Sequence, residues 1–272
     1  MKKWSKKKIV AELKARSKEL KHSPSAREIP AILYQACLRY FGGFNRSKKA
    51  AGLKINDIKH HRLPKSAFRS SKELAYILGV ERGDGHCFYS KSSHGTSAGL
   101  ILRVKDKDFA IYFKEKLERW AKLPVSFGLG YNNLYHVRLS SVEVAKFIRQ
   151  FAFNENSFPN KNHKIYFLKG LFDSEGSVAG YNLSNRRRAC RWISFSNSNK
   201  DTVNLLCKFL SDLRINHKIK SRIHSGFGST KMQYEVYIYG KENLVRYHNL
   251  INFSIKRKQK ILKEVLDSYI KD

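Results

Sequence analysis

The sequence predicts a mixed α and β protein, α/β in the broad sense and α+β by its order of elements, with two similar units behind a small helical module. Two observations indicate this fold class. The first is a short motif that occurs at residues 77–85 and again at 168–176. The second is that each copy is followed by the same alternation of helical and strand patterns. A third observation concerns the partner: 54 Lys and Arg against 22 Asp and Glu give a formal net charge of +32. Such an excess predicts a polyanionic partner.

Each motif combines a predicted helix, small residues four apart, an acid and a closing glycine. Residues at i and i+4 share a helix face, so small residues there predict that the two helices pack closely on each other. Acids at both helix ends would repel each other and the helix dipoles, and a divalent cation relieves such repulsion. One copy alone is typical of an ordinary glycine-capped helix end. The small residues are Gly79, Gly83, Gly170 and Ser174, and the acids are Asp84 and Glu175.

Length and composition bound the remaining possibilities. A chain of 272 residues with 42% hydrophobic residues can bury a core in each unit. The sequence shows no apolar run of membrane-spanning length and no apolar signal core, so we expect an intracellular protein, cytoplasmic in a prokaryote or organellar. The four cysteines are scattered, which predicts reduced thiols and no zinc site. They are Cys37, Cys87, Cys190 and Cys207.

Residues 1–66 are rich in Lys and Arg and are predicted to form a helical extension. Ile9 and Leu13 have helical spacing after Ser5, and residues 23–25 predict the start of a second helix. A short third helix is expected to end at Gly52. The simplest interpretation is a solvated basic extension, because charge runs are often exposed faces.

The first unit is assigned to residues 67–155 and is predicted as helix, two strands, helix, two strands, helix. Ser71 is expected to cap the motif helix, residues 90–97 to form a loop, and residues 98–104 a strand with one apolar face. Asp106 or Asp108 is expected to cap the next helix, which carries an apolar stripe from Phe109 to Trp120.

The second unit, residues 156–272, is predicted to repeat this order. Asn199 or Asp201 is the expected cap of its middle helix, and a basic helix is expected from about Ser254. On the strands of both units, cations and polar residues alternate with apolar ones, which predicts a sheet face suited to the DNA major groove. The predicted DNA contacts are Arg103, Lys105, His136, Arg138, Arg188, Trp192, Ser194, Lys218, Lys220 and Arg222.

The paired motifs resemble those of the LAGLIDADG homing endonucleases in their two-motif, single-chain form, over about residues 70–272. The resemblance implies two pseudo-symmetric αββαββα units with saddle-shaped antiparallel sheets. It also implies that the last acid of each motif, Asp84 and Glu175, binds catalytic Mg²⁺ as part of a site with two or more divalent ions. Main-chain carbonyls of Gly83 and Ser174 are the implied additional ligands.

The same resemblance implies further catalytic side chains at strand ends. They correspond to Asp106 and Arg138 in the first unit and to Asn197 and Tyr239 in the second. Asp106 and Tyr239 depart from the polar neutral or cationic residues of the family, and Asp106 has the helix cap as its alternative role. The cations expected to substitute are Lys105, Lys231 and Lys241.

Residues 4–52 resemble the helical repeat often found attached to homing endonucleases. The resemblance rests on Trp4-Ser5, Pro24-Ser25, Phe41-Gly-Gly-Phe44-Asn45 and Ala51-Gly52. It implies that residues 1–66 are an auxiliary DNA-binding module, with Arg46, Lys48 and Lys49 as phosphate contacts.

The combined expectation is a monomeric homing endonuclease that binds a long, asymmetric duplex and hydrolyses both strands with Mg²⁺, leaving short 3′ overhangs. Such an enzyme promotes the mobility of its host intron. Two alternatives remain open. A basic surface does not distinguish DNA from RNA, so the protein could be an intron RNA maturase. It could also be a DNA-binding regulator that does not cleave, although a binder has no need for paired acids.

Overall fold

The computed structural model describes residues 4–55, 62–92, 95–181, 190–226 and 229–269. The chain divides into a small N-terminal part, Met1–His60, and a larger part, His61–Asp272, and each is described by itself. Within the described ranges, none of the helices is long and apolar enough to pass through a lipid bilayer.

The N-terminal unit is a bundle of short helices around Ile9, Leu13, Leu33 and Cys37. The side chain of Ser5 caps the first helix, as its position predicts. The prediction of an α-helix from residues 23–25 is wrong. A capping box closes a single 3₁₀ turn there, and the next α-helix begins only after Pro30. The elements are α1 (Lys6–Leu20), η1 (Ala26–Glu28), α2 (Ala31–Phe41) and α3 (Phe44–Ala50).

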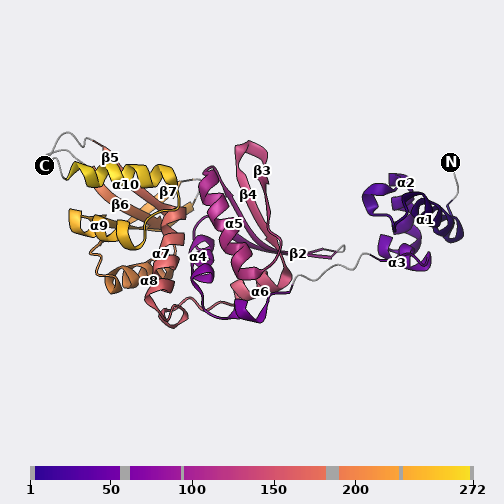
Figure 1. Ribbon diagram of the computed structural model, residues 1–272, viewed down its shortest axis with the longest axis horizontal. Coiled ribbons are helices and arrows are strands. Elements are labelled where there is room, and N and C mark those ends of the chain that lie inside the picture. Colours follow the sequence, from indigo (N-terminus) through magenta and orange to yellow (C-terminus); the bar gives the residue numbers. More distant parts are fainter. Residues whose placement is uncertain (1–3, 56–61, 93–94, 182–189, 227–228, 270–272) are drawn as a thin grey trace. The chain divides into compact units, whose positions relative to one another are not determined.

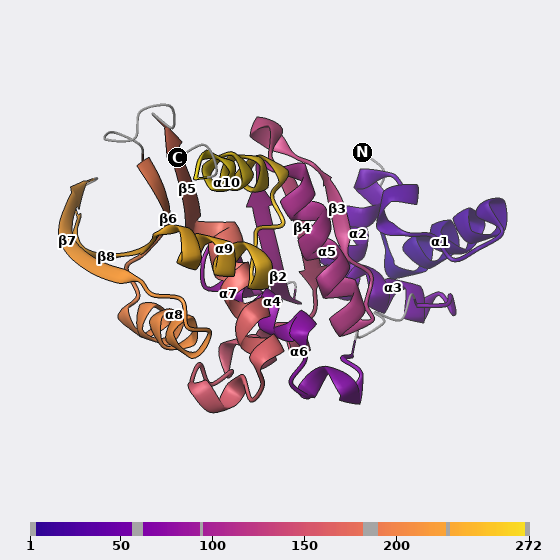
Figure 2. The same cartoon turned by 60° about the vertical axis from the view of Figure 1, so that its left-hand side comes forward.

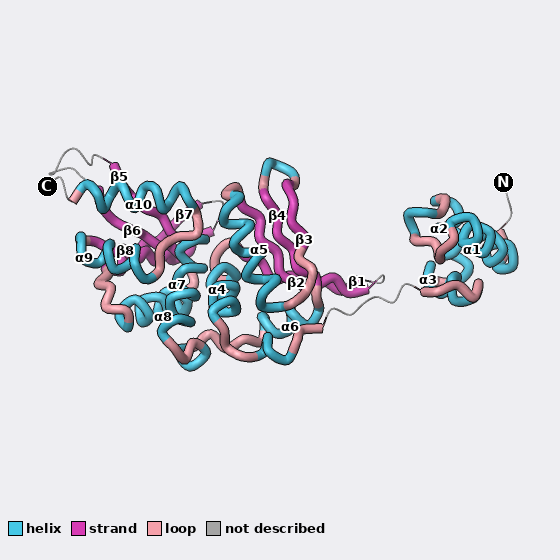
Figure 3. The backbone as a smooth tube through the Cα atoms, in the orientation of Figure 1, coloured by secondary structure: helices cyan, strands magenta, loops and turns pink. Residues whose placement is uncertain are grey.

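The rest of the chain contains two αββαββα units, each with a four-stranded antiparallel sheet (Figures 1 and 3). Both sheets place their first two strands and last two strands in the same order, β1-β2-β4-β3 and β5-β6-β8-β7. The predicted fold class is confirmed. The first unit, entered through η2 (Lys65–Phe68), contains α4 (Lys72–Glu81), β1 (Gly85–Ser92), β2 (Gly95–Val104), α5 (Lys107–Ala121), β3 (Ser126–Leu129), η3 (Tyr131–Asn133), β4 (Tyr135–Ser140) and α6 (Val142–Arg149).

The second unit follows a connector that includes a single 3₁₀ turn, and it ends with one additional helix, α10. This helix packs on β5, the edge strand of the second sheet, where a Cβ on Gly180 would lie 2.7 Å from Val265. The elements are η4 (Glu155–Ser157), α7 (Lys161–Glu175), β5 (Gly176–Tyr181), β6 (Cys190–Asn197), α8 (Lys200–Asp212), β7 (Lys218–Gly226), β8 (Ser229–Tyr239), α9 (Lys241–Leu250) and α10 (Lys256–Ser268).

The two units are related in register as well as in order. Ile101 on β2 pairs with Arg138 on β4, and Trp192 on β6 pairs with Tyr239 on β8. Relative to the motifs, however, Leu102 on β2 pairs with Gly85, and Phe195 on β6 pairs with Gly176. Leu102 and Phe195 are therefore equivalent, so Tyr237 and not Tyr239 is the counterpart of Arg138, and Asn199 and not Asn197 is the counterpart of Asp106. The predicted correspondence of these residues between the two halves is wrong.

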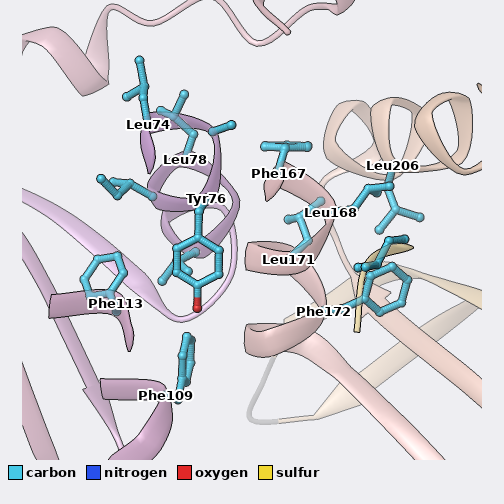
Figure 4. Packing of buried hydrophobic residues seen from close by; sticks show 14 of the residues in the cluster. Leu74, Tyr76, Leu78, Phe109, Phe113, Phe167, Leu168, Leu171, Phe172 and Leu206 are labelled. Carbon is cyan, nitrogen blue, oxygen red and sulfur yellow. The ribbon is translucent and has the colours of Figure 1, made fainter. Parts of the chain in front are cut away.

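One core joins both units, because alternate strand residues point toward the helices. On β2, Leu100 and Leu102 are fully buried under α5, whose Phe109 and Phe113 are also buried. Figure 4 shows Phe109 and Phe113 beside Tyr76 of α4, and Phe167 and Leu171 on the neighbouring α7. The predicted apolar stripe of α5 is confirmed.

Helices α4 and α7 lie side by side at the centre of this core (Figure 2). Their contact is made by glycines. A Cβ added to Gly79 would lie 2.2 Å from the carbonyl oxygen of Phe167, and one added to Gly170 would lie 2.4 Å from that of Tyr76. The predicted close packing of the two motif helices is confirmed at these residues.

One local expectation is wrong. Residues 90–97 do not form one loop, since β1 extends to Ser92 and β2 starts at Gly95, with their ends paired. On the edge strand β7, the apolar residues that alternate with the cations are exposed: Ile219 is 52% and Ile223 is 66% exposed.

Candidate active site and nucleic-acid interface

The motif acids lie where α4 and α7 meet. Glu175 is the last residue of α7, whereas α4 already ends at Glu81, so Asp84 lies in the turn that leads into β1. The prediction that Asp84 ends the motif helix is therefore wrong, since Asp84 lies about one helical turn beyond the last residue of α4. A Cβ on Gly83 would lie 2.4 Å from the Cβ of Ser174 and 3.1 Å from the Cγ of Glu175. Small residues thus bring the two acid-bearing segments into contact.

The two carboxyls influence each other. Burial raises the pKa of Asp84, the ammonium of Lys258 opposes this increase, and Asp106 adds to it. Burial also raises the pKa of Glu175, and the charge of Asp84 raises it further. Ionising both carboxyls side by side, without a cation between them, therefore costs free energy.

This donor set fits a hard divalent cation. In the described part of the chain, no group of three or more His, Cys, Asp or Glu side chains is arranged to hold a metal. Mg²⁺ keeps several waters and binds through one or two carboxylates, so the pair Asp84 and Glu175 suits it. The carbonyls of Gly83 and Ser174 remain predicted ligands.

Asn197, at the end of β6, reaches the motif of the first unit. Its Nδ2 donates to the carbonyl of Arg82 at 3.2 Å, and its Oδ1 accepts from the backbone N–H of Asn199 at 2.8 Å. The guanidinium of Arg82 lies 3.5 Å from the ring centre of Phe153. Asn197 is thus held one residue away from Gly83, as a side chain near the metal would require.

Asp106, at the end of β2, is engaged by α10 instead. Arg257 donates to it from Nε at 2.7 Å and from a terminal nitrogen at 2.8 Å, and these bonds are the main cause of its lowered pKa. Of the two predicted caps of α5, Asp106 occupies the N-cap position but makes no side-chain cap bond. Asp108 accepts from the backbone N–H of Phe109 at 3.1 Å, in the first turn of α5, and from that of Lys256.

Lys258 is a functional-site residue that sequence analysis missed. It is 6% exposed, and its Nζ donates to the carbonyls of Asp173 at 2.7 Å and Phe172 at 3.2 Å, at the end of α7. Burial lowers its pKa to about 8. A signal exists in the sequence, because Lys258 occupies the same helical stripe as the buried Leu262 and Val265.

Asp173 is a second missed residue. It is 1% exposed, and burial raises its pKa. Its two oxygens accept from the hydroxyl of Tyr76 on α4 at 2.8 Å and from the backbone N–H of Ser254 at 2.7 Å. This buried carboxyl therefore ties both motif helices to the segment that leads into α10.

The front face of the first sheet, defined as the side opposite the helices, carries predicted DNA contacts. Arg103 and Lys105 are exposed there, and His136 is half-buried. Arg138 is not brought to Asp84. Its guanidinium bonds to Ser140 at 3.0 Å and lies 4.7 Å from the ring centre of Phe88, further along the sheet than the motif. Arg138 therefore lies on the front face of the sheet, where a DNA contact is predicted, and does not lie beside the acids.

The front face of the second sheet is aromatic at its centre and cationic at its edge. Trp192 meets Tyr237 and Tyr239 with ring centres 6.4 Å apart in both pairs, and Ser194 lies next to them on β6. The predicted contacts on the edge strand β7 are all exposed; they are Lys218, Lys220 and Arg222. Arg188 lies outside the described residues.

In the N-terminal unit, the prediction for Lys48 is wrong. Its side chain is 1% exposed, and its Nζ donates to the carbonyl of Pro24 at 3.0 Å, so it cannot contact a phosphate there. Arg46 and Lys49 are exposed, as a phosphate contact requires.

The paired motif helices, the two sheets and the acid pair form the arrangement that the resemblance to the LAGLIDADG family implies. Residues 162–252 match the family model of the LAGLIDADG-like domain, and residues 4–54 match that of the homing endonuclease associated repeat. The chain therefore carries both modules, and both resemblances seen in the sequence are confirmed.

Two uncharacterized proteins of Methanocaldococcus jannaschii are similar in sequence. One is 30% identical over 175 residues, which cover 58% of this chain and 62% of the relative. The other is 29% identical over 216 residues, which cover 73% of each. A variant of the homing endonuclease I-DmoI, solved with its target DNA and manganese, matches with a TM-score of 0.50 and 18% identity. The match covers 66% of this chain and 93% of that chain, and it establishes the fold.

Proposed function

We propose that this protein is a site-specific homing endonuclease that hydrolyses both strands of a long double-stranded DNA target with divalent metal ions. One observation carries the proposal. Asp84 and Glu175, from the two motifs, converge where Gly83 meets Ser174 at the ends of the motif helices, between two sheets whose front faces bear cations and aromatic rings. A protein that only bound DNA would gain nothing from an electrostatically unfavourable acid pair at this place.

The chain's own residues divide the work. Bound Mg²⁺ would supply an activated water and stabilise charge on the leaving oxygen. Asp84 and Glu175 would hold the ions, and Asn197 would orient water beside the carbonyl of Arg82. The exposed cations of both sheets would neutralise phosphates and fix the duplex over the acids. Mg²⁺ is the proposed ion because two hard oxygen ligands leave room for its waters.

The unlike front faces support an asymmetric target. The first sheet presents Arg103 and Arg138, and Arg reads guanine edges. The second sheet presents Trp192 and Tyr237, which offer apolar contacts. A single chain with both faces needs no partner copy, so we propose a monomer. We further propose that it acts inside the cell, that it promotes mobility of a host intron, and that residues 1–66 add DNA contacts.

The test is cleavage of a randomised duplex library. The wild type and the double variant Asp84→Asn with Glu175→Gln would be incubated with the library and Mg²⁺, Ca²⁺ or EDTA, and new DNA ends sequenced. The proposal predicts paired cuts within one enriched sequence, with short 3′ overhangs, only for the wild type with Mg²⁺. Tight DNA binding without cuts would contradict it and favour a regulator. Preferential binding to structured intron RNA would contradict it and favour a maturase.

A further inference from the structure

The N-cap positions of α5 and α8 are equivalent and hold unlike residues, Asp106 and Asn199. Asn199 caps its own helix by accepting from the backbone N–H of Thr202, whereas Asp106 bonds to Arg257 of α10, which belongs to the second unit. An acid at the start of α5 would repel a phosphate, so this position of the first unit lacks a cation of its own.

Arg257 lies where that cation is missing. Its Nε and one terminal nitrogen each bond to a separate oxygen of Asp106, at 2.7 Å and 2.8 Å. The side chain of Asp106 is only 22% exposed, whereas that of Arg257 is 62% exposed. A guanidinium has five N–H donors in a fixed plane, so donors remain free to face solvent or a phosphate after the carboxylate is satisfied.

The first turn of α10 is fixed on both sides. The carboxylate of Asp108, from the first unit, accepts from the backbone N–H of Lys256. Lys258 donates to the carbonyls of Phe172 and Asp173, just before Glu175. Arg257, next to Lys258 in the chain, is thus held by Asp106 in a turn that contacts the end of α7 just before Glu175.

We propose that Arg257 binds the phosphate attacked at the first unit and that Asp106 is the positioning residue which orients it. The inference rests on the proposed function, and it assigns the missing cation to α10 instead of to Lys105. The asymmetry predicts a strand-specific role. Each unit serves one strand, so loss of Arg257 should slow the cutting of one strand more than that of the other.

The experiment measures both strands separately, on a target duplex labelled differently at each 5′ end. The variants are Arg257→Gln, Arg257→Lys and Asp106→Asn. Lys105→Gln tests the competing assignment, in which Lys105 supplies the cation. Lys260→Gln is the matched control, since Lys260 lies on the same helix and its side chain is 80% exposed. Melting temperatures and DNA affinity without Mg²⁺ would be measured for each variant.

Arg257→Gln should slow one strand by about 10-fold or more relative to the other, so that nicked duplex accumulates, with unchanged DNA affinity. Asp106→Asn should give the same bias to a smaller degree, and Arg257→Lys should restore part of the rate. Lys260→Gln should behave as the wild type. If Arg257→Gln lowers the melting temperature, the inference is tested by the strand bias of Asp106→Asn alone, because that variant keeps the guanidinium.

Four results would overturn the inference. Equal slowing of both strands would make Arg257 a structural residue. Strand bias from Lys105→Gln but not from Arg257→Gln would return the role to β2. A wild type that cuts neither strand would overturn the proposed function and the inference together, whereas an active wild type with unbiased variants would overturn the inference alone.

Discussion

The amide nitrogen of Asn197 donates to the main-chain carbonyl of Arg82 at 3.2 Å, across the boundary between the two units. Asp106, which follows β2, makes the opposite crossing to Arg257. Each unit therefore uses a residue at or just after the end of its second strand to bond to the other unit. The packing of α4 on α7 sets the acids together, and these two crossings fix what surrounds them.

We predict that Asn197→Asp destabilises the protein, because a carboxylate would replace the donor and face the Arg82 carbonyl. The expected loss is about 1–2 kcal/mol, seen as a lower melting temperature. Asn204→Asp, on the exposed side of α8, is the control and should change little. An unchanged melting temperature for Asn197→Asp would mean that the bond to Arg82 contributes nothing.

We predict that Gly79→Ala and Gly170→Ala each destabilise the helix pair, since each new Cβ would lie within 2.4 Å of a carbonyl oxygen of the facing helix. The expected loss is about 2–3 kcal/mol or more, measured by thermal or urea unfolding. In an isolated helix the same change would stabilise by about 1 kcal/mol. A raised melting temperature would therefore show that α4 and α7 are not in contact. Gly43→Ala, with nothing within 4 Å of its new Cβ, is the control.

Two buried tyrosines give a matched comparison. Tyr76 donates to the buried carboxyl of Asp173, so Tyr76→Phe should cost about 1.5–3 kcal/mol. The hydroxyl of Tyr247 is buried without a hydrogen-bond partner among the described residues, so Tyr247→Phe should be neutral or stabilising. Chemical unfolding measures both. Equal losses in the two variants would contradict a specific role of the bond to Asp173.

The acid pair predicts a pH-dependent gain in stability on neutralisation. Folding raises the pKa of Asp84 above its ordinary 3.8 and that of Glu175 above 4.5, so the wild type loses stability as pH rises through these raised values. In EDTA at pH 7, Asp84→Asn with Glu175→Gln should therefore melt a few degrees higher than the wild type. The difference should vanish below the ordinary values, where both carboxyls are protonated in either state. A variant that melts lower at pH 7 would contradict the raised pKa values.

Local patterns were sufficient for much of the fold. Strand alternation and helix stripes depend on neighbours in sequence, so the core faces of β2 and α5 and the packing of Gly79 on Gly170 could be predicted. The partner of Asp106 could not, because Arg257 is distant in sequence and only the docking of α10 brings it near. The burial of Lys48 could not be predicted for the same reason, since the carbonyl that it contacts belongs to Pro24, which is distant in sequence.

The site was predictable in its centre and less so around it. The acids follow from a repeated motif, whereas Lys258 and Asp173 are single charged residues in apolar stripes. Their place in an apolar stripe indicates burial, but only the structure shows what they bond to. The exposed Ile223 on β7 shows the converse, since alternation indicates which side chains share a face but not whether a helix covers that face.

The most direct test of the central claim is calorimetric titration of Mg²⁺ into the protein bound to its selected DNA target. We predict that the wild-type complex binds Mg²⁺ beyond what the free duplex binds, and that Asp84→Asn and Glu175→Gln each weaken this binding by about 10-fold or more. Asp201→Asn, on the exposed start of α8, should leave it unchanged. Binding that is unaltered in both acid variants would contradict a shared metal centre at the junction of α4 and α7.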